Sequence, residues 1–264
     1  MSVILRIAYD GTDFHGWARQ SVDQRGVVPR TVQGELERVL GELCGRPMQV
    51  RGASRTDAGV HANGQLAAFE RTTPIPCENL VRALGKALPR DLVVTDAWEE
   101  QGERDVRRDN AGKHYRYRIR TSALRDPTTI RYEWHLGRAL ALAPMRDAAA
   151  RLIGTHDFAS FRAAACQAKT TVRTIQAVEI VQVGDELLDV HVHGLAFLHM
   201  MVRIIVGTLV EIGIGRMAPA TIDELLATPD RGAAGRTAPP SGLTLELVRW
   251  PGLDPSFAPA RDPG

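Results

Sequence analysis

Two halves of the chain are predicted to share one order of strands and helices, and this repeat constrains the fold more than any other feature. In the first half, apolar residues at every second position over 3–9 predict a strand with one buried face. Thr31 then precedes apolar residues at helical spacing, so we expect a helix with Thr31 as its N-cap. Short strands near 48–53 and 65–69, a second helix around 80–88 and a strand over 92–98 complete the order β-α-β-β-α-β.

The second half gives the same order. A strand is predicted over 113–121 and a helix over 144–153, with Pro144 just inside its start and Gly154 just past its end. A hairpin, a long helix, a short helix and a last strand follow, at 174–183 with 186–193, 197–213, 221–227 and 243–250.

Two such halves predict the α+β class, with each half a split βαβ unit of the ferredoxin-like type. We expect their sheets to join into one mixed, mostly antiparallel sheet with a central cleft between the halves. The expected domains are residues 1–102, which carry the loop around Asp57, and residues 103–250, which carry a basic strand and a core helix. Residues 251–264 hold four prolines and predict a Pro-rich tail that is draped on the surface or disordered.

Composition and spacing exclude several other classes of protein. The 264 residues are 44% hydrophobic, with 33 Lys and Arg against 31 Asp and Glu, which excludes collagen-like, low-complexity and disordered chains. Three widely spaced cysteines without a Cys-x-x-Cys pair argue against a disulfide framework and favour a reducing compartment. The N-terminus has no apolar region of the signal-peptide kind, so we expect a cytoplasmic protein. The apolar segment 195–214 carries His199, Arg203 and Glu211, which favours a buried helix over a membrane span.

Positive charge gathers in one stretch of the chain. Residues 104–138 hold ten Arg and Lys against four acidic residues, as expected where a phosphate-rich partner binds. Within this stretch, the strand 114–120 places tyrosines and Ile119 on one face and arginines on the other. The pattern fits a half-buried strand with a solvated arginine face as well as it fits nucleic acid held by arginines beside a stacking tyrosine.

The densest chemistry lies in a loop over 53–65. Its glycines and small residues allow tight turns and the close approach of a ligand. Arg55 and Asp57 place a guanidinium and a carboxylate two residues apart. Taken alone, an Arg-Thr-Asp turn is more typical of an Asx-capped surface loop than of a catalytic site.

Several blocks of the sequence, in order, resemble the tRNA pseudouridine synthase A family. Seven consecutive residues around Asp57 make the resemblance specific, and it runs from about residue 3 to about residue 250. The blocks are YDGTDFHGW at 9–17, TVQGELE at 31–37, RTDAGVH at 55–61 with Gly64-Gln65, KHYRY at 113–117, DFASFR at 157–162 and FLHMMVRIIVG at 197–207.

This resemblance implies an activity and a set of partners. The expected reaction isomerises uridine to pseudouridine at positions 38, 39 and 40 of the tRNA anticodon stem-loop. The family needs no cofactor and no metal, and it acts as a homodimer in which one tRNA contacts both subunits. The family's two ferredoxin-like halves with an active cleft between them agree with the strand order above.

The family's motifs imply roles for particular residues. Asp57 matches the catalytic aspartate, whose carboxylate serves C1′ or C6 of uridine, and attack at C1′, attack at C6 and a glycal route all stay open. Arg203 matches the arginine that keeps this carboxylate ionised, although a snorkelling helix arginine would show the same pattern. Tyr115 matches the active-site tyrosine that stacks on the extruded uracil, while Tyr117 is expected to pack in the core. Arg55 would fill the gap left by the flipped base or hold a phosphate.

Other positions are expected to contact the RNA backbone or depart from the family. Arg107 keeps its family position, and Arg116 and Arg118 on the basic strand face are expected to contact phosphates. The departures are Ser54 in place of the usual glycine, Ala18 in place of glutamine, and Arg104 and Arg108 in place of aromatic residues. We interpret the two extra arginines as added phosphate contacts.

The residues suggest three other functions. A zinc site could use His191, His193 and His199, but no carboxylate or cysteine completes it at the usual spacing. A cytidine deaminase is excluded because Cys77 lacks the second cysteine of the Pro-Cys-x-x-Cys motif. A non-catalytic RNA-binding or RNA-folding protein that uses the same basic cleft stays as the alternative from another class.

Overall fold

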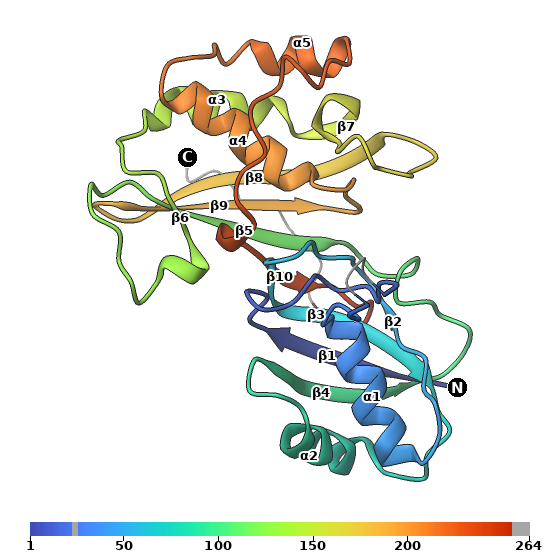
Figure 1. Cartoon of the computed structure of the whole chain (residues 1–264). Helices are drawn as coiled ribbons and strands as arrows, with labels where there is room; N and C mark the ends of the chain where they lie inside the picture. The colour runs from blue at the N-terminus through green and yellow to red at the C-terminus, as the bar shows by residue number, and fades with distance from the viewer. Residues whose placement is uncertain (23–25, 255–264) are drawn as a thin grey trace. The chain divides into compact units, whose positions relative to one another are not determined.

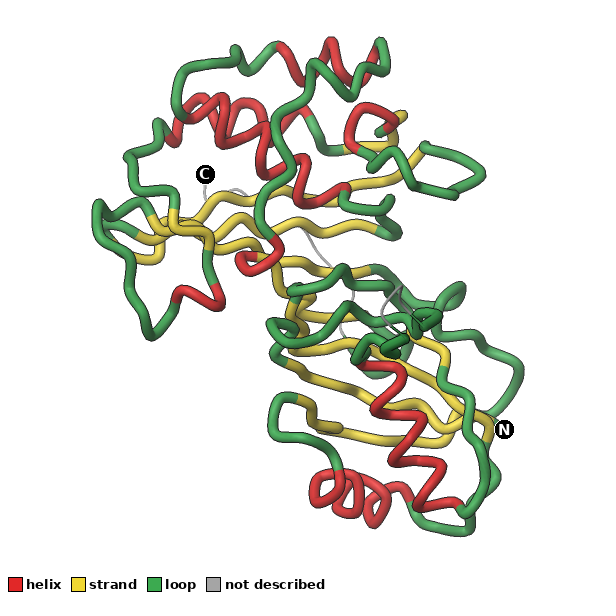
Figure 2. The backbone as a smooth tube through the Cα atoms, viewed as in Figure 1, coloured by secondary structure: helices red, strands yellow, loops and turns green. Residues whose placement is uncertain are grey.

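The computed structural model describes residues 1–22 and 26–254, and contacts divide it into two compact units (Figures 1 and 2). The first unit is Met1–Ala111 with Thr244–Asp254, and the second is Gly112–Leu243. By contacts, the last strand of the chain therefore groups with the first unit. The division into domains 1–102 and 103–250 stays a prediction.

The first unit has the order β-α-β-β-α-β that the sequence predicts. Strand β1 lies between β3 and β4 and is antiparallel to both. On its other side, β3 pairs with two short segments: β2 is antiparallel to it near Ala68, and β10 is parallel to it near His61. The elements are β1 (Ser2–Tyr9), α1 (Val32–Cys44), β2 (Arg51–Gly52), β3 (His61–Glu70), α2 (Cys77–Ala87), β4 (Leu92–Glu100) and β10 (Leu243–Val248).

Local sequence signals account for the first helix. The side chain of Thr31 accepts a hydrogen bond from the N–H of Gly34, as an N-cap does. Gly45 ends the helix with φ 68°, a left-handed conformation that favours glycine. The residues of α1 that are buried are Val32, Leu36, Val39 and Leu40, which lie on one face of the helix.

The end of the described chain packs against β1 and β4. Trp250 is almost fully buried, and its indole N–H donates to Glu100 at 2.9 Å. Asp254 forms an ion pair with Arg6 at 3.0 Å and accepts a hydrogen bond from the N–H of Trp250 at 2.8 Å. The first residues of the Pro-rich tail are therefore anchored, while residues 255–264 lie outside the described residues.

The second unit is a mostly antiparallel sheet with helices on it. The strand order is β5-β9-β8-β7, with antiparallel neighbours throughout and β6 added parallel to β5. Helices α3 and α4 pack on each other, α3 also packs on β8, and α5 packs on α3 (Figure 1). The elements are β5 (Lys113–Arg120), β6 (Trp134–His135), α3 (Leu142–Arg151), β7 (Gly154–Asp157), β8 (Val172–Gly184), β9 (Leu187–Gly194), α4 (Met201–Gly213), α5 (Thr221–Ala227) and 3-10 turns at Ile130–Tyr132, Ala159–Phe161 and Pro240–Gly242.

The α+β class with mostly antiparallel pairing is confirmed. The junction of the two sheets and the cleft between the halves stay predictions. The expected helix over 197–213 begins later, at Met201, because Met200 adopts a left-handed conformation with φ 60° and breaks the helical path. The helix expected over 144–153 spans Leu142–Arg151 instead, and Gly154 begins the short strand β7.

Helix α4 is buried along nearly its whole length, as expected for a core helix. Within residues 1–22 and 26–254, every helix is too short or too polar to cross a bilayer.

Candidate active site

The Asp57 loop, residues 53–60, connects β2 to β3 in the first unit. The side chain of Gln65 on β3 binds the backbone of Ser54 in both directions: it accepts from the N–H at 3.2 Å and donates to the carbonyl at 2.8 Å. Asp57 is half-buried and Arg55 is exposed. Ser54, which replaces the family's usual glycine, is thus held through its backbone N–H and carbonyl. A glycine at this position could form the same two hydrogen bonds.

Residues 10–17, here called the bed, bind the backbone of this loop on both sides of the aspartate. The N–H of Trp17 donates to the carbonyl of Thr56 at 3.0 Å. The N–H of Gly59 donates to the carbonyl of Phe14 at 3.3 Å. Asp57 therefore lies in a span whose two ends are fixed to the same segment.

Gly16 is a point of close approach between the bed and the part of the loop around Asp57. Its φ is +90°, and a Cβ at this position would lie 2.8 Å from the carbonyl oxygen of Thr56 and 3.1 Å from the nitrogen of Ala58. Only glycine fits both the backbone conformation and the space. The blocks of sequence around Gly16 and around Asp57 are thus parts of one packed arrangement.

A buried hydrogen bond ties the same loop to β1. The hydroxyl of Tyr9 and the Oγ1 of Thr56 are 2.8 Å apart, and both side chains are buried. The N–H of Val60 closes a turn on the carbonyl of Asp57 at 3.2 Å. The residue before the aspartate is fixed by its side chain, and the aspartate itself is fixed by its backbone.

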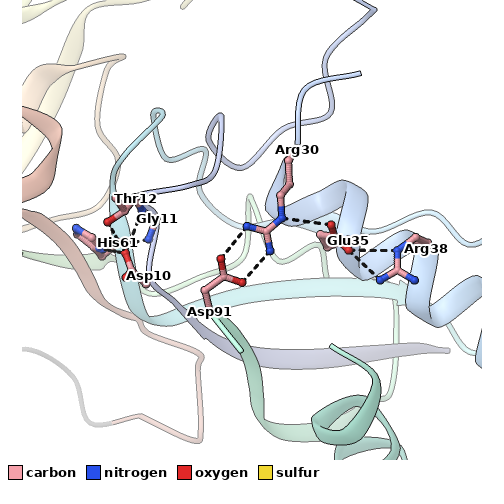
Figure 3. Close-up of polar contacts among 8 residues, drawn as sticks. All are labelled: Asp10, Gly11, Thr12, Arg30, Glu35, Arg38, His61 and Asp91. Carbon is pink, nitrogen blue, oxygen red and sulfur yellow. Dashed lines mark hydrogen bonds and ion pairs between the residues drawn. The ribbon is translucent and has the colours of Figure 1, made fainter. Parts of the chain in front are cut away.

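His61 connects the loop to the start of the bed (Figure 3). Its Nδ1 accepts a hydrogen bond from the N–H of Gly11 at 3.0 Å and lies 3.2 Å from Oδ1 of Asp10. The same Oδ1 accepts from the N–H and the hydroxyl of Thr12 at 3.0 and 2.6 Å. Because Nδ1 accepts from a backbone N–H, the neutral ring carries its proton on Nε2.

Arg30, which lies two residues before α1, pairs with Asp91, the residue before β4 (Figure 3). Its guanidinium binds both carboxylate oxygens of Asp91, at 2.7 and 2.8 Å, and lies 4.0 Å from the ring centroid of Phe14. The backbone carbonyl of Arg30 accepts from the N–H of His15 at 2.8 Å. The hydrogen bonds from Arg30 lower the pKa of the Asp91 carboxyl below its usual value.

In the second unit, β5 has the two faces that the sequence predicts. Tyr115, Tyr117 and Ile119 are buried, whereas the arginines between them are half-buried. The ring of Tyr115 meets Phe197 edge to face, with centroids 5.2 Å apart. Tyr117 is fully buried, which agrees with its expected packing role.

The basic face of β5 holds a buried carboxylate. Asp189 on β9 lies opposite Arg118, which binds it through Nε at 2.8 Å and through Nη2 at 2.7 Å. Arg116 approaches the same carboxylate at 3.9 Å. Asp189 is 4% exposed, so part of the positive charge on this face is balanced inside the protein.

Arg203 lies in the first turn of α4 and is half-buried. Its Nε donates to the carbonyl of Ala238 at 2.8 Å. The N–H of Ala238 in turn donates to the carbonyl of Arg203 at 3.0 Å. The expected ion pair between Arg203 and Asp57 would join residues of different units and stays a proposal.

Residues 104–108, which include the departures Arg104 and Arg108, are held by hydrogen bonds within the segment. Asp105 accepts hydrogen bonds from the N–H groups of Arg107 and Arg108 at 2.9 and 3.2 Å. Val106 is buried, while the side chains of Arg104, Arg107 and Arg108 are exposed.

Two histidines of the alternative zinc site, His191 and His193, both contact His114. His114 and His191 share a hydrogen bond of 2.9 Å between ring nitrogens, and the rings of His114 and His193 stack with centroids 4.1 Å apart. Among the residues that the structure describes, no group of three or more His, Cys, Asp or Glu side chains is arranged to hold a metal ion.

Sequence reasoning missed two residues that support this geometry. Asp91 is the partner of Arg30, and Asp189 is the partner of Arg118. Asp189 lies on a predicted strand, but its pairing with Arg118 depends on the register between two strands, which spacing does not give. Asp91 precedes a predicted strand and Arg30 precedes a predicted helix, so the spacing of residues gives no signal that their side chains meet.

Comparison with known proteins agrees with the motif blocks. The family model described as tRNA pseudouridine synthase matches residues 6–107 and 148–251. The chain is 44% identical over 250 residues to the tRNA pseudouridine synthase A of Geobacter sulfurreducens, covering 94% of this chain and 99% of that protein. It is 42% identical to the tRNA pseudouridine synthase A of Myxococcus xanthus, over 98% of this chain and 94% of that protein. The protein of that name from Halalkalibacterium halodurans is 42% identical over 90% of this chain and 89% of its own length.

Proposed function

The chain belongs to the tRNA pseudouridine synthase family, and from this premise we propose that it converts uridine to pseudouridine at positions 38, 39 and 40 of the tRNA anticodon stem-loop. The observation that carries the proposal is the Asp57 loop, whose backbone is bound on both sides of the carboxylate by Trp17 and Phe14. A carboxylate held in this way is preorganised for chemistry on a base that approaches it.

The reaction needs a group of this kind. The N1–C1′ bond of uridine breaks, the base turns, C5 bonds to C1′, and a proton leaves C5. Asp57 acts as the nucleophile in this proposal, on a uridine flipped out of the stem-loop. A target near the end of a stem is easier to extrude than one in the middle of a helix, because fewer stacked neighbours are lost.

Arg203 supplies the positive charge that keeps the carboxylate of Asp57 ionised. A carboxylate in a closed pocket protonates and loses nucleophilicity unless a cation is near it. The hydrogen bond to Ala238 uses the Nε of Arg203, so its pairing with a carboxylate is through Nη1 and Nη2.

The remaining residues bind the substrate. Tyr115 stacks on the flipped uracil, and Arg55, exposed beside Asp57, fills the gap in the stem or holds a phosphate. Arg107, Arg116 and Arg118 contact the RNA backbone. The protein works in the cytoplasm as a homodimer that holds one tRNA against both subunits.

Tritium release tests the reaction and its position together. A tRNA transcript labelled with tritium at C5 of uridine loses the label to water only when the new C5–C1′ bond forms. We expect the wild-type protein to release tritium from this transcript, and the release to stop when uridines 38–40 are replaced by cytidine. Tight binding of the tRNA without any release would contradict the proposal and favour the non-catalytic RNA-binding protein.

A further inference from the structure

Residues 235–239, here called the strap, run along helix α4 of the second unit and are bound to it. The N–H of Gly235 donates to the hydroxyl oxygen of Thr208 at 3.0 Å. Ala238 exchanges two hydrogen bonds with Arg203, one through the backbone carbonyl of Arg203 and one through its Nε. The strap therefore holds the guanidinium of Arg203 at its Nε.

Close contact makes this arrangement specific. A Cβ on Gly207 would lie 1.7 Å from the carbonyl oxygen of Arg236, so the strap approaches α4 at a distance that only glycine permits. The guanidinium of Arg236 lies 4.8 Å from the ring centroid of Trp134. Contacts on both sides thus fix the strap between the helix and an aromatic ring.

Tyr117 holds the far end of the strap. Its hydroxyl donates to the carbonyl of Pro239 at 2.7 Å, next to the peptide that binds Arg203. The ring is fully buried and meets Trp134 edge to face at 6.1 Å. Burial raises the pKa of the Tyr117 phenol far above its usual value, so the hydroxyl keeps the proton that it donates.

We propose that Tyr117 is a positioning residue for pseudouridylation, which acts through the strap to fix the guanidinium plane of Arg203. The guanidinium is planar, so a fixed Nε–H direction also fixes the directions of Nη1 and Nη2. Small displacements of a group that acts on the transition state have large effects on rate. This inference rests on the role proposed above for Arg203, and it gives Tyr117 a function beyond core packing.

The substitution Tyr117→Phe removes only the hydroxyl and tests the proposal through kinetics. We expect kcat for tritium release to fall about tenfold while KM for tRNA changes less than about twofold. Ser160→Ala is the control, because the buried hydroxyl of Ser160 donates to the carbonyl of Leu225 at 2.7 Å and accepts from the N–H of Asp230 at 2.9 Å, and both partners lie outside the strap. Both variants are expected to lose stability, but only Tyr117→Phe should lose kcat. An equal fall in kcat for the two variants would overturn the proposal.

A double-mutant cycle and a spectroscopic measurement separate this inference from the function on which it rests. In the Arg203→Ala background, Tyr117→Phe should change kcat no further, and an undiminished additional fall would contradict a role through Arg203. NMR of the Arg203 Nε–H in the protein without tRNA should show faster hydrogen exchange in Tyr117→Phe than in Ser160→Ala or wild type. Unchanged exchange would overturn the positioning role whatever the kinetics. If exchange changes but Arg203→Ala leaves kcat intact, the positioning stands and the catalytic role of Arg203 is wrong.

Discussion

At the scale of single residues, the arginines proposed to contact tRNA are of two kinds. Some form an ion pair with a carboxylate inside the protein, and others have exposed side chains. Arg118 binds the buried Asp189 through two nitrogens, whereas the side chain of Arg107 is exposed. A charge that is paired internally contributes to stability as well as to any RNA contact. The two residues should therefore behave differently when each is replaced.

Arg118→Ala is expected to lower the free energy of unfolding by about 2–3 kcal/mol, because it removes the bidentate partner of a buried carboxylate. Arg107→Ala should change it by less than about 0.5 kcal/mol. Each variant should make the dependence of log Kd for tRNA on log salt shallower by about 0.8. Urea unfolding and salt titrations measure both quantities, and an unchanged stability of Arg118→Ala would show that Asp189 does not need this partner.

Gly16 supports the Asp57 loop because its backbone lies close to that of Thr56 and Ala58. Substitutions at two glycines separate the effect of this contact from the effect of backbone conformation. Gly16 and Gly45 both have positive φ, but only at Gly16 would a Cβ meet the loop, while at Gly45 it meets nothing within 4 Å. Gly45→Ala should cost about 1 kcal/mol of stability and leave kcat unchanged. Gly16→Ala should cost more and also lower kcat, because it displaces the backbone next to Asp57. If the two variants had the same kcat, the bed would not position the aspartate.

At the scale of elements, spacing predicted the helices and strands whose signals are local. Thr31 is the expected N-cap of α1, and the structure confirms it. The start of α4 was misplaced by four residues because Met200 takes a left-handed conformation that its sequence does not favour. The pairing of Arg118 with Asp189 depends on the register between β5 and β9, which no single segment encodes.

The pair formed by Arg30 and Asp91 links the segment before α1 to the start of β4, and it makes stability depend on pH. Because the folded-state pKa of Asp91 is lowered, the pair stabilises the fold above the unfolded pKa of about 3.9 and loses this effect as pH falls through the folded value. Asp91→Asn should therefore be less stable than wild type at pH 6, and the difference should shrink as pH falls below about 4.

Urea unfolding at a series of pH values measures this difference. Asp147→Asn is the control, because Asp147 is about half exposed and pairs with Arg151 within one helix, where an ion pair contributes little. A difference between wild type and Asp91→Asn that stayed constant from pH 6 to pH 3 would contradict the assignment to this carboxylate.

At the scale of the whole molecule, the repeated order β-α-β-β-α-β predicted the α+β class because each half has its own periodicity. It did not predict that Thr244–Asp254 would group by contacts with the first unit, where β10 pairs with β3 and Trp250 packs against β4. Such contacts join segments far apart in sequence, and alternation of apolar residues carries no information on the partner strand. The motif blocks indicate contacts that periodicity cannot predict, because Tyr9–Trp17 and Arg55–His61 pack together in one site.

The central claim is that the carboxylate of Asp57 carries out the reaction, and one comparison tests it most directly. Tritium release from tRNA labelled at C5 of uridine should be lost in Asp57→Asn, by at least about a thousandfold in rate, while the Kd for tRNA stays within about threefold of wild type. The substitution preserves the shape of the side chain and all the backbone hydrogen bonds of the loop. Full release by Asp57→Asn would contradict the account and leave the Asp57 loop as a structural turn.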